Sequence, residues 1–439
     1  MDKRNRRRTA VELGKDVLIV LLTCSALWML GGSGLLQRLE LSREESPQVT
    51  STQNAATEQV QAARPMRITA TLAGDGEPER CSLQYDDAGV DGVFQQVAGL
   101  LMETLSSAEA PQTVNRRAWE QALAQAPGIC FDFQGDMPLS VLAGWLNVEL
   151  ELPDTVTRRL LLTVWQDQVA LYYSALDDGS WYRCTTPVVS RAQLEHALEG
   201  LSANGAYYAF ESEHTGQMAR DTLLVPEPGP LPVYVASNPV SGGRSALENL
   251  MADLGFNLSG CVFYSAAGEE VARSGSDTLR LSTGGMVEYH AGQEGARQFP
   301  VTPIAGESGV FAAVESCRQL LQSSMNSRCG QARLYLSRVE QRGSGWHLEF
   351  EYSLDGVSVG LKSGPAARFE ISAGAITAFT LALRSYAPGE EWQLTLPPVQ
   401  AAAAMTALEL EGRELQLMYR DTGEERVVPN WTAVVSEVR

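Results

Sequence analysis

The sequence predicts an α+β protein in which a single N-terminal transmembrane helix is followed by antiparallel β-rich domains with packed helices, the C-terminal part being an internal repeat. Three observations support this prediction. An uncharged apolar run fills residues 17–36. Residues 346–355 alternate between apolar and polar side chains, as a half-buried antiparallel strand does. Two stretches with apolar residues at helical spacing each precede a similar series of strand-like segments.

The N-terminus predicts a membrane anchor. Residues 1–16 carry six basic and three acidic groups, and the 20 uncharged residues that follow would form a helix about 30 Å long, the thickness of the bilayer core. Because basic residues stay in the cytoplasm, we expect a cytoplasmic segment 1–16, a transmembrane helix 17–36 and an extracytoplasmic bulk, which places the protein in the cell membrane. A cleaved signal peptide is the alternative, but no small-residue cleavage site follows the run.

Residues 37–65 lack apolar periodicity and are interpreted as a linker. An N-terminal extracytoplasmic α+β domain is expected over residues 66–230. Ser190 and Gln193 form a capping box there and predict a helix start. The proline- and glycine-rich stretch 226–232 marks the end of this domain. The other expected elements are helices over 93–105 and 138–146 and strands over 129–133, 160–165 and 169–173.

A C-terminal extracytoplasmic α+β domain is expected over residues 231–439, with repeat halves of about 231–300 and 301–439. Ser245 and Glu248 match a capping box, and Gly255 would end the helix that they begin. A second helix is predicted over 310–321. Each helix precedes strands, and a Tyr-Ser-x-x-Gly motif at Tyr264 returns at Tyr352. This similarity predicts that the domain consists of two related halves.

The composition argues against several functions. The net charge of −19 opposes nucleic acid as a partner, because binding to phosphates needs cations. The four histidines have no partners at metal-ligand spacing, and no hydrolase, nucleotide or dinucleotide motif is present. Adjacent acids such as Asp86-Asp87 flank glycines and are interpreted as turns. We therefore expect no catalytic residues, no cofactor, no metal and no small-molecule substrate, and interpret the chain as not an enzyme.

Seven cysteines are present, six of them beyond the predicted span. An even number in an extracytoplasmic domain permits disulfides without requiring them. Cys317 and Cys329 are the candidate pair, and the full pattern stays open.

Four stretches resemble the YycH/YycI family, extracytoplasmic regulators that accompany the WalK (YycG) sensor histidine kinase of the WalK/WalR (YycG/YycF) two-component system in Gram-positive bacteria. These stretches are Ala26-Leu27-Trp28 after the basic start; 129–133 with Met137-Pro138-Leu139, 160–164 and 169–173; 350–359; and 417–419 with 428–431. The resemblance implies β-rich outer domains, a role in signal transduction and cell-wall homeostasis, and no catalytic residues. The six outer cysteines and the glycine-rich end of the span depart from the family pattern.

The leading hypothesis is therefore a membrane-anchored accessory protein that regulates a sensor histidine kinase through transmembrane and outer-domain contacts. The resemblance implies two partners, the kinase and a second YycH/YycI-like protein. Trp28, Gly31, Ser33 and Gly34 are the candidate contact residues in the span, since small residues let helices approach closely in lipid. The alternative is an envelope ligand- or peptide-binding module without a kinase partner. An anchored enzyme is the third and least supported class.

Overall fold

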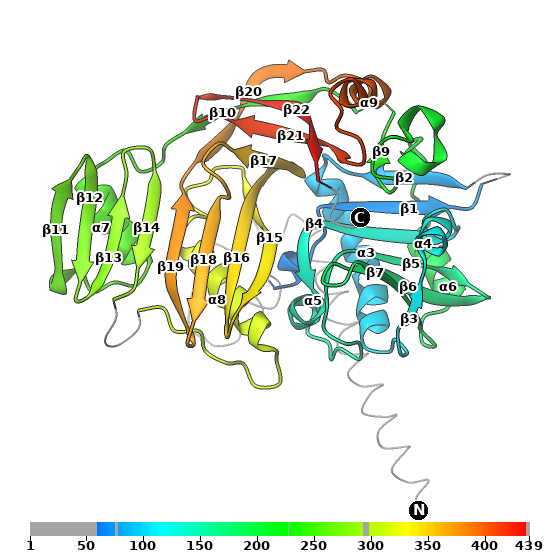
Figure 1. Cartoon of the computed structure of the whole chain (residues 1–439), viewed down its shortest axis with the longest axis horizontal. Coiled ribbons are helices and arrows are strands. Elements are labelled where there is room, and N and C mark those ends of the chain that lie inside the picture. Colours follow the sequence, from blue (N-terminus) through cyan, green and yellow to red (C-terminus); the bar gives the residue numbers. More distant parts are fainter. Residues whose placement is uncertain (1–58, 75–77, 227, 293–297, 436–439) are drawn as a thin grey trace, which may run out of the picture. The chain divides into compact units, whose positions relative to one another are not determined.

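The computed structural model describes residues 59–74, 78–226, 228–292 and 298–435, and Gln59–Arg439 form one compact unit. The predicted cytoplasmic segment, the predicted span and most of the predicted linker lie outside these residues. No helix in the described part of the chain is both long and apolar enough to cross a membrane. The described part is α+β with mainly antiparallel sheets (Figure 1), which confirms this portion of the fold prediction.

The first half forms a seven-stranded antiparallel sheet in the order β2-β1-β4-β5-β6-β7-β3. Its strands are β1 (Arg67–Leu72), β2 (Glu79–Leu83), β3 (Gln112–Val114), β4 (Gly128–Pro138), β5 (Val156–Trp165), β6 (Gln168–Ala175) and β7 (Ser180–Thr185). A separate pair, β8 (Tyr207–Tyr208) and β9 (Leu223–Leu224), follows it with the short 3-10 helices η2 (Ala209–Glu211) and η3 (Glu213–Thr215).

Helices cover both faces of this sheet. Phe131 and Leu162 pack with α3 (Asp87–Leu105) and α5 (Leu139–Leu146) in one apolar cluster. Their neighbours Cys130 and Leu161 point to the opposite face and pack with Trp119 of α4 (Arg116–Leu123). Burial on both faces explains why residues 160–162 of β5 are a continuous apolar run rather than an alternating one. The predicted capping box at Ser190 is present and begins α6 (Arg191–Ala197).

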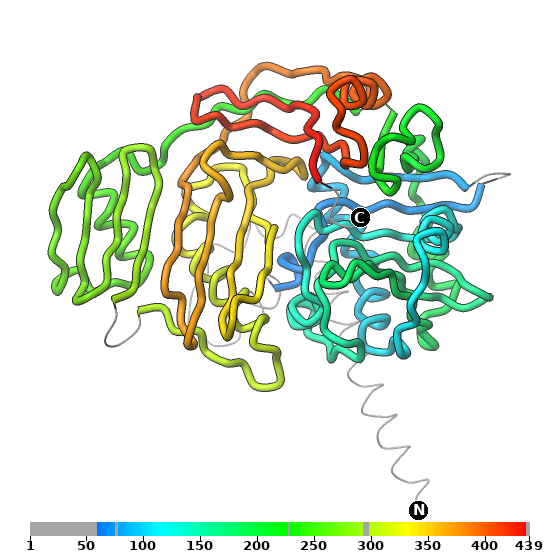
Figure 2. The backbone as a smooth tube through the Cα atoms, in the orientation of Figure 1, coloured from blue at the N-terminus to red at the C-terminus, as the bar shows by residue number. Residues whose placement is uncertain are grey.

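The strands after the proline-rich segment form a thirteen-stranded sheet in the order β11-β12-β13-β14-β19-β18-β16-β17-β21-β22-β10-β20, with β15 paired to β16. Its strands are β10 (Leu231–Ser237), β11 (Cys261–Ala266), β12 (Glu269–Ser274), β13 (Asp277–Leu281), β14 (Met286–His290), β15 (Arg333–Arg342), β16 (Gly345–Leu354), β17 (Val357–Leu361), β18 (Ala367–Ser372), β19 (Ala375–Ala382), β20 (Ser385–Gln393), β21 (Glu414–Asp421) and β22 (Arg426–Val434). Figure 2 shows β10, in green, beside the C-terminal strands in red. The pairing of β17 with β21 is parallel.

Two helix-and-meander units occur in this sheet. Helix α7 (Arg244–Asp253) and η4 (Leu258–Gly260) precede the meander β11–β14, and α8 (Gly309–Ser324) precedes β15, β16, β18 and β19. The last strands of the two units pair with each other, with Tyr289 opposite Phe379. The Tyr-Ser-x-x-Gly motif does not mark equivalent strands, however, because Tyr264 lies in the first strand of its meander and Tyr352 in the second.

Two local predictions need correction. Helix α7 begins at Arg244 after Gly243, whose φ of 58° suits glycine, so Ser245 lies inside the helix and caps nothing. The strand predicted over 346–355 is β16, but its polar face is partly covered, with His347 and Ser353 buried.

The last helix, α9 (Pro398–Ala407), has proline in its first turn, where the missing N–H costs nothing.

Candidate functional site

A buried charge cluster joins the two sheets. Strand register places Arg67 of β1 opposite Asp132 of β4, and Asp132 opposite Arg159 of β5. Arg158 also reaches Asp132, with 3.2 Å between its Nε and the carboxylate Oδ1. Glu414 of β21 completes the cluster from the second sheet, and Arg67 Nη2 donates to its Oε1 over 2.6 Å. The side chains of all five residues are at most 9% exposed.

The cluster is electrically balanced and its hydrogen bonds are satisfied. Arg158 and Arg159 both donate to Glu414, and Arg159 also pairs with Asp221, so three guanidiniums face three carboxylates. Burial alone would raise the pKa of Glu414, but the three guanidiniums outweigh it and hold that pKa at about 2. The same three guanidiniums outweigh the effect of burial at Asp132 and hold its pKa well below the usual range. Because every carboxylate already has cationic partners, the cluster is a structural contact rather than a vacant ion site.

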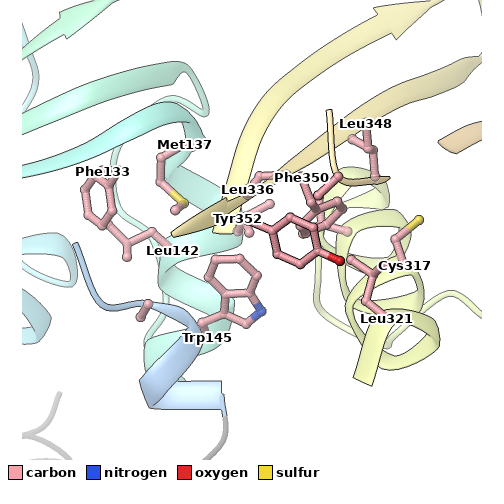
Figure 3. Packing of buried hydrophobic residues seen from close by; sticks show 14 of the residues in the cluster. Phe133, Met137, Leu142, Trp145, Cys317, Leu321, Leu336, Leu348, Phe350 and Tyr352 are labelled. Carbon is pink, nitrogen blue, oxygen red and sulfur yellow. The ribbon is translucent and has the colours of Figure 1, made fainter. Parts of the chain in front are cut away.

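A second contact joins α5 to α8. Trp145 Nε1 donates to Glu315 Oε2 over 3.1 Å, and Arg318 binds the same carboxylate through two nitrogens at 2.8 Å. Gly144 allows close approach, because a Cβ there would lie 2.5 Å from the ring of Phe311. Figure 3 shows Trp145 in one apolar core with side chains of both halves. The two halves of the described chain are therefore joined by a helix contact as well as by the charge cluster, and β4 and β15 add a third contact through Asp136 and the Val339 N–H.

An exposed apolar segment runs from the end of β20 into the start of α9. Four large apolar side chains within eight residues face solvent, with exposed fractions of 65% for Trp392, 78% for Leu394, 54% for Leu396 and 43% for Val399. We call these four residues the 392–399 surface. Contiguous apolar exposure of this kind is typical of protein–protein contacts, and tryptophan is enriched in their centres.

The 392–399 surface is hydrogen-bonded to β22, the neighbour of the strand that carries Glu414. Trp431 of β22 donates its Nε1–H to the carbonyl of Leu396 over 2.8 Å. Trp431 pairs with Leu417 of β21, the strand that begins at Glu414. Helix α9 packs on the same strand through Met405 and Leu415. The surface is therefore connected through β22 to β21, the strand that enters the buried charge cluster.

A groove runs along the exposed side of α8. It has a volume of about 440 Å³ and lies between the helix and the segment 298–304. Ser316, Gln319 and Leu320 of α8 face Phe299 and Thr302 across it. The lining combines apolar and uncharged polar groups with one carboxylate, Glu315, which Arg318 already binds, and such a lining suits an extended ligand such as a peptide.

The residues predicted from the sequence are placed as follows. Trp28, Gly31, Ser33 and Gly34 lie outside the described residues, so their contact role stays a prediction. Cys317 and Cys329, the candidate disulfide pair, are free thiols in this structure. Cys317 is fully buried in α8, whereas the Cys329 thiol donates to the carbonyl of Ala332 over 3.0 Å.

The described residues offer little for catalysis. No group of three or more histidine, cysteine or acidic side chains among them is arranged to hold a metal. Burial raises the pKa of both Cys130 and Cys184 to about 12, which keeps these thiols protonated and poorly nucleophilic. His347 is buried between Glu349 and Glu370, its Nδ1 lying 2.7 Å from Glu370 Oε1. It contacts two carboxylates but no candidate nucleophile.

Comparison with known proteins identifies the fold. No family model matches the sequence. The solved structure of YycH from Bacillus subtilis superposes on 86% of this chain and on 95% of its own length, with a TM-score of 0.55 and 9% sequence identity. The chain has the fold of YycH. The fold that the resemblance implied is thus confirmed, and an identity this low shows the fold alone.

A curated relative of another kind shares a short segment. Hydroxymethylglutaryl-CoA synthase from Aeropyrum pernix is 29% identical over 123 residues, which is 28% of this chain. The chain covers about a third of the length of that synthase, at 31%.

The buried charge cluster was not predicted from the sequence, although two signals were present. Asp132 interrupts an otherwise apolar alternation, and Arg158-Arg159 directly precedes the apolar run of β5. Charged residues within apolar strands are rarely buried unless they are paired, so each implied a partner. Glu414 was the missing partner, and it lies 347 residues from Arg67.

Proposed function

We propose that this chain is a non-enzymatic, membrane-anchored regulator of a sensor histidine kinase, acting through contacts made by its outer domain. The observation that carries the proposal is the YycH fold over 86% of the chain. The 392–399 surface supports it, since a regulator must present a surface to a partner. The span over 17–36 would hold the protein beside the kinase, with Trp28, Gly31, Ser33 and Gly34 facing the kinase helices.

The physical mechanism is differential binding. The kinase is the partner that binds the 392–399 surface. If it binds this surface more favourably in one of its two states, the bound regulator shifts the kinase toward that state. The rigid connection from Leu396 through Trp431 to β21 fixes the surface on the body of the domain. A second YycH/YycI-like protein is the other expected partner, in keeping with the family resemblance.

Co-purification tests the proposal. The full-length protein is expressed with the histidine kinase of its source organism, and complexes are isolated from solubilised membranes. We expect the wild-type protein to capture the kinase, and Leu394→Asp to weaken capture at least tenfold. Val188→Asp is the matched control, because Val188 is an exposed valine, at 55%, on the other half of the chain. Failure of the wild type to capture any kinase would contradict the proposal, as would equal losses in the two variants.

A second candidate function is binding of an envelope peptide or wall fragment, and the groove along α8 favours it. Glu315 lines this groove and also accepts the Trp145 hydrogen bond, so a ligand there would contact the α5–α8 connection. A panel of peptides and wall fragments should raise the melting temperature of the protein if the groove binds one of them. Gln319→Trp, which fills the groove, should abolish that rise.

A further inference from the structure

The two ends of the thirteen-stranded sheet are protected to very different degrees. One end is β20, which carries Pro388, Glu390 and Glu391, and its pairing with β10 is interrupted by a register shift. Proline, charge and irregular pairing are the usual devices that keep an edge strand from pairing with another chain. The other end is β11, and Figure 1 shows it outermost in its sheet.

Strand β11 has none of these devices. Its sequence, Cys-Val-Phe-Tyr-Ser-Ala, contains no charge and no proline, and its pairing with β12 is regular over all six residues. Val262 is 63% exposed and Tyr264 is 44% exposed on the solvent face. An uncharged, regular edge with exposed β-branched and aromatic side chains is suited to strand pairing.

The hairpin geometry shows which backbone groups point outward. A two-residue turn, Ala267-Gly268, joins β11 to β12, and both residues have positive φ, as in a type I′ turn. Ala266 and Glu269 flank the turn and form its close hydrogen-bonded pair. Hydrogen bonding alternates along an antiparallel strand, so Tyr264 and Val262 also bond to β12. Cys261, Phe263 and Ser265 therefore direct their backbone groups away from the sheet, and the Cys261 N–H is already bonded to the carbonyl of Leu258.

We propose that β11 is a homodimer seam, at which β11 of a second copy pairs antiparallel with it about a two-fold axis at Phe263. In this register the two Phe263 residues exchange both backbone hydrogen bonds, and each Ser265 N–H donates to the Cys261 carbonyl of the other copy. Every outward donor of the strand is then satisfied. Val262 of each copy lies opposite Tyr264 of the other, a β-branched and aromatic pair of the kind that stabilises antiparallel sheets.

A second copy fits this edge better than an unrelated strand for two reasons. The edge is self-complementary, since one register satisfies both copies equally, which is the requirement of a two-fold interface. The chain carries a net charge of −19, so two copies repel each other over most of their surface, whereas β11 is uncharged. The contact involves a single strand from each copy, so it falls below the roughly 1,200 Å² of a stable interface and is expected to be weak.

Analytical ultracentrifugation of the full-length protein in density-matched detergent, from micromolar to millimolar concentration, tests the seam. We expect a concentration-dependent dimer that Val262→Lys weakens at least tenfold. Val235→Lys is the matched control, because Val235 is 49% exposed but lies in β10, between two other strands. A wild-type protein that stays monomeric, or equal weakening by both lysines, would overturn the proposal. A dimer unaffected by Val262→Lys would also overturn it and would point to another contact, such as the span.

A cross-linking experiment tests the register independently of any loss of stability. Opposed residues of a hydrogen-bonded pair have Cα atoms about 5.5 Å apart, within disulfide range. Phe263→Cys should therefore give a disulfide-linked dimer under mild oxidation, beyond the wild-type background, whereas Ser276→Cys, on the exposed turn between β12 and β13, should not. Equal yields from the two variants, or a dimer from Ser276→Cys alone, would contradict the register.

Discussion

Glu414→Gln is the substitution that most sharply separates a buried charge contact from a surface one. The substitution removes one negative charge from a cluster in which the Glu414 side chain is 2% exposed, and leaves three guanidiniums facing two carboxylates. The decrease of the Glu414 pKa from 4.5 to about 2 corresponds to roughly 3 kcal/mol of charge-dependent stabilisation. Breaking a buried ion pair by removing one partner costs about 3–5 kcal/mol. We expect Glu414→Gln to lower the free energy of unfolding by about 3–5 kcal/mol.

Urea denaturation of the purified protein, followed by tryptophan fluorescence, measures this loss. Glu391→Gln is the matched control, because Glu391 pairs with Arg426 over 2.8 Å while its side chain is 68% exposed. An exposed pair contributes at most about 1 kcal/mol, so the control should barely move the unfolding midpoint. Equal shifts for the two variants, or stabilisation by Glu414→Gln, would refute the assignment of the cluster as a stabilising contact between the sheets.

The same substitution predicts a pH dependence. The pKa of Glu414 is lower in the folded protein than in the unfolded chain, so its stabilisation is complete above about pH 5 and is lost as the pH falls toward 2. The wild type should therefore lose stability across this window more steeply than Glu414→Gln. If the free energy of unfolding of the two proteins changed equally with pH, Glu414 would not be the group that titrates.

Two further substitutions test other contacts. Gly144→Ala places a Cβ 2.5 Å from the Phe311 ring and should destabilise the protein by about 1–3 kcal/mol. Gly99→Ala, in α3, places a Cβ that meets no atom within 4 Å and should stabilise the protein by up to about 1 kcal/mol. Thermal unfolding of both variants checks that the two effects have opposite signs. Burial raises the pKa of Asp355, which has a φ of 50°, so Asp355→Asn should stabilise the protein slightly at pH 7 and lose this advantage as the pH falls through the raised pKa. A lower urea midpoint for Asp355→Asn at pH 7 would contradict this reasoning.

Local features of the fold could be predicted from the sequence where short-range chemistry decides them. The capping box at Ser190 and the end of α7 before Gly255 depend on residues within one turn. Ser245 was placed wrongly because Gly243, with its positive φ, begins the helix two residues earlier. The alternation of helix and strands after residue 231 was visible, but matching Tyr264 to Tyr352 assumed equal strand counts after the two helices, and the second meander places one more strand before its motif.

The long-range features could not be predicted in the same way. The contact of Arg67 with Glu414 needs β1 and β21 brought together from opposite ends of the chain, and no spacing rule encodes that. The 392–399 surface was also missed, because exposed Leu394 and Leu396 look in the sequence like ordinary strand residues of a core. Apolar periodicity indicates that a side chain can be buried, and only the tertiary fold decides whether a neighbour covers it.

The most direct test of the proposed regulatory role is site-specific photo-cross-linking in intact membranes, with the photoreactive amino acid at Leu394 or, as control, at Val188. The account predicts a cross-link from position 394 to a sensor histidine kinase and none from position 188. Absence of a kinase cross-link at 394, or equal cross-linking at both positions, would contradict it.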